Sequence, residues 1–136
     1  MFFVISMSEQ KRVIIFGTFD TVHKGHEYFV EEASKYGGLT IVIARDVNVK
    51  KFKEVLRNNE NERLANVLKS FPGAESMLGN IDDPHKIIEI IEPDIICLGY
   101  DQASFDAGLA EKFPDIKIVR LEAFEPERYK TSKILI

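Results

Sequence analysis

The chain of 136 residues has little cysteine, no long apolar run and no excess of positive charge. Its single cysteine, Cys97, excludes an intramolecular disulfide and fits a reducing cytosol, so we expect a cytoplasmic protein. The apolar start at residues 1–5 is too short for a signal sequence or a membrane span and follows no basic segment, so no membrane partner is expected. A net charge of −4 with a pI near 5.4 argues against a nucleic-acid-binding surface.

The rest of the composition is typical of one compact domain with a hydrophobic core, since 45% of the residues are hydrophobic and 29% are charged. We expect a short N-terminal extension at residues 1–11 and a single domain at residues 12–136. Apolar runs alternate with helical patterns along this domain, which predicts a parallel sheet. The expected strands are 12–16, 39–44, 94–98 and 116–121, with a weak candidate at 74–79; the expected helices are 24–36, 60–71, 84–91 (capped by Asp83) and 109–113.

The most informative segment is GTFDTVHKGH at residues 17–26, directly after the apolar run at residues 12–16. It lies where a strand covered on both faces meets a helix. The first turn of a helix offers unpaired backbone N–H groups and a partial positive charge, which favour an anion. His23 and His26 lie about one turn apart, so both rings could donate to one phosphoryl group, while Gly25 lets a ligand approach the backbone. The segment therefore predicts a phosphate site.

Two other interpretations of these side chains stay open. A histidine near a helix start is often a cap or a packed side chain. Asp20, His23 and His26 could also bind a transition metal, because carboxylate and imidazole ligands suit such ions. No further strong ligand lies nearby in the sequence, and the helix terminus already explains an anion site, so a metal is not our expectation.

The segment resembles the active-site motif of the HxGH nucleotidyltransferases, the cytidylyl- and adenylyltransferases that join a nucleotide to a phosphorylated acceptor and release pyrophosphate. The resemblance is specific, because it covers residues 17–20, His23, Gly25 and His26 together. With the alternation of strands and helices, it implies an α/β fold: a Rossmann-like, doubly wound, parallel five-stranded sheet with helices on both faces.

Two further segments, residues 44–51 and 94–102, are similar to the archaeal FAD synthases, which transfer AMP from ATP to FMN. The similarity extends from Arg12 to Ile134. It implies ATP and FMN as small-molecule substrates and Mg²⁺ carried by the triphosphate, and it allows a homodimer. Two departures leave the acceptor open: Lys24 replaces a proline or aromatic residue, and residues 54–61 lack the basic, proline-containing character of many relatives.

The resemblance also implies roles for individual residues. The catalytic set comprises His23 and His26 at the α-phosphoryl oxygens and Lys50 and Lys133 at the other phosphates. The implied ATP-binding residues are Thr18, Phe19, His23, Lys24, Gly25, His26, Asp101, Tyr129, Thr131 and Ser132. Lys51 and Lys53 add charge beside Lys50, although a solvated loop is the simpler explanation.

Arg63 falls where many family members carry a helix arginine near the phosphates. An exposed arginine on the surface of a helix is the simpler interpretation of this position, so Arg63 is only a weak candidate.

The scaffold alone does not select an acceptor. One alternative is a glycerol-3-phosphate cytidylyltransferase that forms CDP-glycerol from CTP, or a transferase acting on another phosphorylated acceptor. An alternative of another class is a nucleotide-binding regulatory module without turnover. Product formation from defined pairs of nucleotide and acceptor distinguishes these possibilities.

Overall fold

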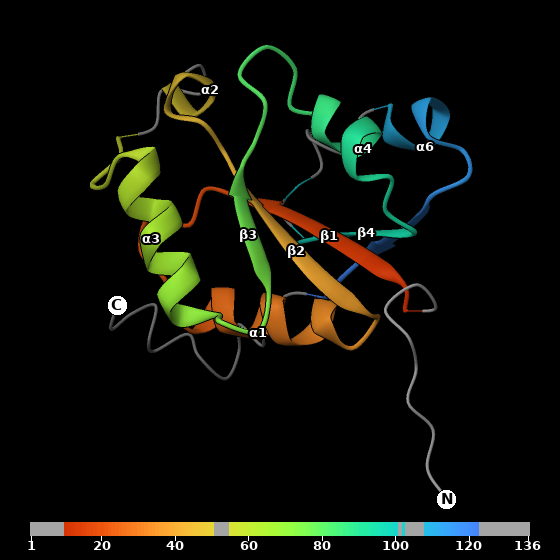
Figure 1. The fold of residues 1–136 in the computed structure, drawn as a ribbon, viewed down its shortest axis with the longest axis horizontal. Coiled ribbons are helices and arrows are strands. Elements are labelled where there is room, and N and C mark those ends of the chain that lie inside the picture. The colour runs from red at the N-terminus through yellow and green to blue at the C-terminus, as the bar shows by residue number, and fades with distance from the viewer. Residues whose placement is uncertain (1–9, 51–54, 101, 103–107, 123–136) are drawn as a thin grey trace, which may run out of the picture.

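The computed structural model describes residues 10–50, 55–100, 102 and 108–122, and shows a parallel sheet flanked by helices (Figure 1). The strands are β1 (Arg12–Gly17), β2 (Gly38–Ile43), β3 (Glu75–Leu78), β4 (Ile95–Leu98) and β5 (Lys117–Arg120). They pair in the order β3-β2-β1-β4-β5, and every pair is parallel. The expected five-stranded, doubly wound sheet is confirmed.

Helices cover both faces of this sheet. They are α1 (Lys24–Ser34), α2 (Asp46–Lys50), α3 (Glu60–Ser70), α4 (Lys86–Ile91) and α6 (Leu109–Lys112). α1 and α3 pack on one face, and α4 and α6 pack on the other (Figure 1). Within β1, Val13 and Ile15 belong to the core under α1 and α3, whereas Ile14 and Phe16 belong to the core under α4 and α6. This two-sided burial explains why the β1 sequence is apolar without alternation.

The chain winds outward from β1 in both directions, because β2 and β3 lie on one side of it and β4 and β5 on the other. In such a sheet, ligands bind outside the carboxyl ends of the strands, at the point where the winding reverses. Here that point lies between β1 and β4. The segment with both histidines leaves the carboxyl end of β1, so the topology places it where this fold binds ligands.

The weak strand candidate at residues 74–79 is confirmed as the edge strand β3 at residues 75–78, whose pairing depends on the backbone of β2 more than on its own weak side-chain pattern. Two other local expectations are wrong. Residues 46–50 form α2 where the sequence indicated a loop. The helix expected from Pro84 begins at Lys86, because the Asp83 carboxylate accepts the backbone N–H of His85 (2.9 Å) in a turn that precedes the helix.

Two other expectations concern the whole chain. Within the ranges that the structure describes, no helix is both long and apolar enough to cross a membrane. Residues 1–9 lie outside those ranges, so the N-terminal extension at residues 1–11 stays a prediction.

Cys97 lies within β4 and is fully buried, and burial raises the pKa of its thiol to about 11 because the thiolate would lose its hydration. We expect the native protein to be inert toward a chromogenic disulfide reagent near pH 8, since the thiolate is the reactive species. Unfolding in guanidinium should expose this single thiol and release one equivalent of chromophore. Rapid labelling of the native protein, followed by absorbance, would contradict the buried placement.

Candidate active site

The loop at residues 18–23 leaves β1 through an unusual backbone conformation at Phe19. Its φ of 51° lies in the left-handed region, which a residue other than glycine adopts only where its surroundings hold it. The Phe19 ring is 1% exposed and packs against the His26 ring, with the centroids 4.7 Å apart. Gly17 makes room for it, because a Cβ there would lie 2.5 Å from Phe19 Cε2. The side chain of Phe19 therefore supports His26 from inside the protein.

His23 and His26 cap the start of α1 with their own rings. His23 is the N-cap residue, with φ −139° and ψ −176°, and its Nδ1 accepts the backbone N–H of Gly25 (3.0 Å). His26 Nδ1 accepts the backbone N–H of His23 (3.2 Å) in return. The two rings stack, with centroids 4.0 Å apart and planes inclined by 26°. The spacing of the motif thus produces a reciprocal cap.

This cap assigns the tautomer of both rings. An Nδ1 that accepts a hydrogen bond carries no proton, so the N–H of each neutral imidazole is on Nε2. Each ring therefore has one donor, and its orientation is fixed by the backbone. Two preorganised N–H donors at one helix start are suited to oxygens that gain negative charge in a reaction.

The remaining residues of the segment also favour an anion. α1 is 11 residues long, so its N-terminus carries a partial positive charge. His23 and Lys24 are exposed there, and His26 is half-buried. Gly25 has a second role besides the approach of a ligand, because a Cβ there would lie 2.9 Å from His23 Cε1 and would disturb the capping ring.

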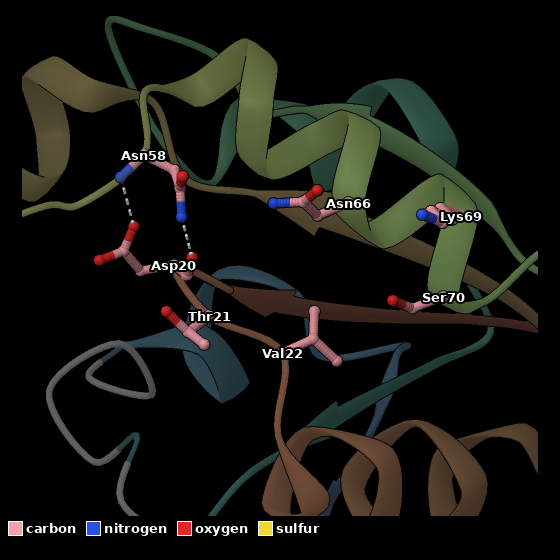
Figure 2. Close-up of a pocket in the computed structure, with 7 residues that line it drawn as sticks. All are labelled: Asp20, Thr21, Val22, Asn58, Asn66, Lys69 and Ser70. Carbon is pink, nitrogen blue, oxygen red and sulfur yellow. Dashed lines mark hydrogen bonds between the residues drawn. The ribbon is translucent and has the colours of Figure 1, made fainter.

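Asp20 faces the loop before α3. Its carboxylate accepts a hydrogen bond from the backbone N–H of Arg57 (2.8 Å). It also accepts one from the backbone N–H of Asn58 (2.9 Å), and the Asn58 side chain donates to the Asp20 carbonyl (Figure 2). The bond from Arg57, followed by the contacts with Asn58 and Arg63, lowers the pKa of the Asp20 carboxyl despite some desolvation. Within the described ranges, no group of three His, Cys, Asp or Glu side chains lies close enough together to hold a metal ion.

Arg63 is fully buried. It is therefore neither an exposed helix residue nor a phosphate contact, the two interpretations that the sequence offered. Its guanidinium donates to the carbonyls of Thr18 (2.8 Å) and Asn58 (3.3 Å) and to Asp46 Oδ1 (2.7 Å). These acceptors come from the histidine loop, from the loop before α3 and from the start of α2. The guanidinium of Arg63 thus binds acceptors inside the protein.

The turn after β4 reaches the same edge of the sheet as the histidine loop. The side chain of Gln102 accepts the backbone N–H of Gly99 (2.8 Å) and donates to the carbonyl of Phe16 (2.9 Å). One amide therefore joins the end of β4 to the end of β1. Tyr100 is exposed beside this bridge.

Of the implied site residues, the structure brings together Thr18, Phe19, His23, Lys24, Gly25 and His26 in one loop and helix start. Lys50 ends α2, but its side chain lies outside the described part of the chain, as do Lys51, Lys53, Asp101, Tyr129, Thr131, Ser132 and Lys133. The assignments to these residues stay predictions.

Sequence reasoning missed the polar residues that hold the segments together. Besides Arg63 and Asn58, these are Arg45 and Glu60. The Glu60 carboxylate accepts hydrogen bonds from Arg45 Nε (3.1 Å) and from the backbone N–H of Asp46 (2.8 Å). The available signal was the group of charged residues just before and inside the helix expected at 60–71. That pattern is also typical of a solvated helix start, so it did not reveal the contacts.

Two shallow hollows flank this region, and neither is lined by His23 or His26. The first, of about 420 Å³, lies between the histidine loop and α3 and is lined by Asp20, Thr21, Val22, Asn58, Asn66, Lys69 and Ser70 (Figure 2). The second, of about 390 Å³, lies beyond the ends of β2 and β3 and includes Arg45, Asn80 and Asp82. The capped histidines therefore mark the candidate site better than either hollow does.

The chain matches known proteins over most of its length. Residues 14–134 match the cytidylyltransferase-like family model. A protein named FAD synthase from Ferroglobus placidus is 39% identical over 132 residues, which cover 92% of this chain and 86% of the relative. Another from Thermoplasma acidophilum is 36% identical and covers 90% of each chain.

Solved structures show the same architecture. The lipopolysaccharide core biosynthesis protein from Thermoplasma volcanium superposes with a TM-score of 0.79 at 34% identity, covering 85% of this chain and 99% of that one. The pantoate-beta-alanine ligase from Francisella tularensis superposes with a TM-score of 0.56 at 16% identity, covering 83% of this chain and 59% of that one, and supports the fold alone.

Proposed function

This chain belongs to the cytidylyltransferase-like family, and we propose that it transfers AMP from ATP to FMN, forming FAD and releasing pyrophosphate. The observation that carries the proposal is the pair of stacked histidines at the start of α1, each with an N–H on Nε2. The two relatives named FAD synthase that are described above, which match 92% and 90% of this chain, support AMP as the group transferred and FMN as the acceptor.

The reaction is a direct in-line displacement. An oxygen of the FMN phosphate forms a bond to the α-phosphorus of ATP, while the bond from that phosphorus to the oxygen bridging it to the β-phosphorus breaks. Pyrophosphate leaves with the electron pair of the broken bond. Negative charge on the equatorial α-phosphoryl oxygens is stabilised by the Nε2–H groups of His23 and His26 and by the N-terminus of α1. The protein contributes position and charge, without a covalent intermediate.

The other phosphates require positive charge beyond the histidines. Lys24 is exposed at the start of α1, and α2 ends at Lys50. We assign Lys50 and Lys133 to the triphosphate, with backbone N–H groups near Thr131 and Ser132, and Asp101 and Tyr129 to ATP. Magnesium enters as part of the substrate, bound to the triphosphate. The lone cysteine requires no oxidising compartment, which supports a cytoplasmic reaction.

A chromatographic assay tests the function directly. Purified protein with magnesium receives ATP or CTP together with FMN, glycerol 3-phosphate or phosphopantetheine, and the nucleotidylated product is identified. FAD formed only from ATP and FMN supports the proposal. CDP-glycerol from CTP would establish the cytidylyltransferase alternative, and tight ATP binding without product from any acceptor would establish the regulatory module.

A further inference from the structure

The buried Arg63 contacts three segments, two of which are distant from it in sequence. It lies on α3, and its acceptors are Thr18 after β1, Asp46 at the start of α2 and Asn58 before α3. A guanidinium presents its N–H groups in one rigid plane, so three simultaneous acceptors are held in fixed relative positions. A lysine, with its flexible stem and compact charge, does not provide this geometry.

The contact with Thr18 lies next to the strained residue of the histidine loop. Phe19 follows Thr18, holds a φ of 51° and supports the His26 ring. A left-handed conformation outside glycine persists only when the surroundings determine it. The Arg63 bond fixes the carbonyl before Phe19, burial fixes its ring, and the Asp20 carboxylate fixes the residue after it. Arg63 thus acts on His26 through the conformation of Phe19.

The contact with Asp46 reaches the second element of the site. Asp46 is the first residue of α2, and α2 ends at Lys50. The Asp46 Oδ1 accepts a hydrogen bond from Arg63 Nη2 (2.7 Å), while the backbone N–H of Asp46 donates to the Glu60 carboxylate (2.8 Å). The start of α2 is therefore tied to α3 at both its side chain and its backbone.

We propose that Arg63 is a positioning residue for adenylyl transfer: its guanidinium sets the histidine loop and α2 in the relative placement that the reaction needs. The proposal rests on the proposed function, because it concerns the geometry of that same site. Burying an ion pair is a poor way to gain stability, since replacing both of its partners with apolar side chains of similar volume often serves as well or better. The placement of three backbone segments is something an apolar residue cannot provide.

The test uses the full chain with Arg63→Met, Arg63→Lys and, as a matched control on α3, the exposed Lys69→Met. The two hydrogen bonds to the Asp20 carboxylate remain in both Arg63 variants, so the loop stays joined to the segment before α3 and we expect the fold to survive. Arg63→Met should lower kcat for FAD formation by about 10²-fold, the cost of misplacing catalytic groups by about 1 Å, with little change in KM for ATP or FMN. Arg63→Lys should recover part of kcat, and Lys69→Met should behave as the unchanged protein.

A second readout reports the histidines without any substrate. Ring nitrogen NMR spectra at mildly alkaline pH should show both His23 and His26 with the proton on Nε2, and Arg63→Met should shift these signals. The third histidine, His85, lies at the start of α4 and serves as the internal reference that does not shift.

The outcomes are distinct. A folded Arg63→Met protein with unchanged kcat and unchanged His23 and His26 signals would overturn the proposal. The proposal would also be overturned if the loss of activity in Arg63→Met equalled the fraction of unfolded protein while the folded protein kept unshifted His23 and His26 signals. If Arg63→Met does not fold, kcat and the His23 and His26 signals of Arg63→Lys decide between the same outcomes. Failure of the unchanged protein to form FAD would overturn the proposed function, and the histidine spectra would still decide whether Arg63 positions the pair.

Discussion

Replacing His26 with alanine should lower the rate of AMP transfer by roughly 10²–10³-fold, the loss typical of removing one preorganised donor to a developing negative charge. His26 is half-buried between the Phe19 ring and the His23 ring, and its Nδ1 accepts a hydrogen bond from the backbone N–H of His23. The substitution therefore removes the Nε2–H donor and also loosens the cap that orients His23. We expect kcat to fall much more than the affinity for ATP.

The fold should survive this substitution. The lost cap bond costs about 1 kcal/mol, and His26 belongs to neither of the two hydrophobic cores. His85→Ala is the matched control, because it removes the histidine that lies away from the site, beside Phe113. Activity is measured as FAD formed per minute, and folding by circular dichroism. Unchanged activity with an unchanged spectrum in His26→Ala would refute the catalytic role.

Replacing Gly17 with alanine should impair both stability and turnover through the Phe19 ring. The new Cβ would lie 2.5 Å from Cε2 and 3.0 Å from Cδ2 of a rigid, buried ring, so the ring has to move. Overpacking of this kind costs about 1–3 kcal/mol. Because the His26 ring rests on the same ring, its displacement by about 1 Å should lower kcat by up to about 10²-fold.

Two variants separate this steric effect from a general effect of glycine replacement. Gly73→Ala introduces a Cβ with no heavy atom within 4 Å, so we expect stability and kcat close to those of the unchanged protein. The double variant Gly17→Ala with Phe19→Leu relieves the clash and should be more stable than Gly17→Ala alone, as measured by urea unfolding. A single Gly17→Ala variant as stable and active as Gly73→Ala would show that the loop tolerates the added methyl group.

The stacked histidines illustrate what a short motif specifies locally. The caps join residues two and three apart in sequence, so their geometry follows from the spacing once a helix begins at Lys24. The glycine between the histidines leaves room for the His23 ring, a role that the sequence does not reveal. The motif and its place after a strand were therefore predictable, whereas the tautomer required the actual hydrogen bonds.

Asp20 and Arg63 illustrate the opposite case. The partners of Asp20 are Arg57 and Asn58, 37 and 38 residues away. Two of the three acceptors of Arg63, Thr18 and Asp46, lie 45 and 17 residues away. From the sequence, Asp20 resembled a possible metal ligand and Arg63 an exposed or phosphate-binding residue. Neither interpretation included the contact that the side chain makes, because nothing near either residue in the chain indicates the distant segment.

The sequence by itself determined the parallel sheet and the location of the histidine pair, and its resemblance to a known family implied helices on both faces. These features depend on apolar periodicity and on contacts within a few residues, which one chain segment encodes. Only the tertiary structure decided how the histidine loop, α2 and α3 are held together. That arrangement depends on hydrogen bonds to backbone groups of distant segments, and a backbone carbonyl or N–H has no signature in the sequence of side chains.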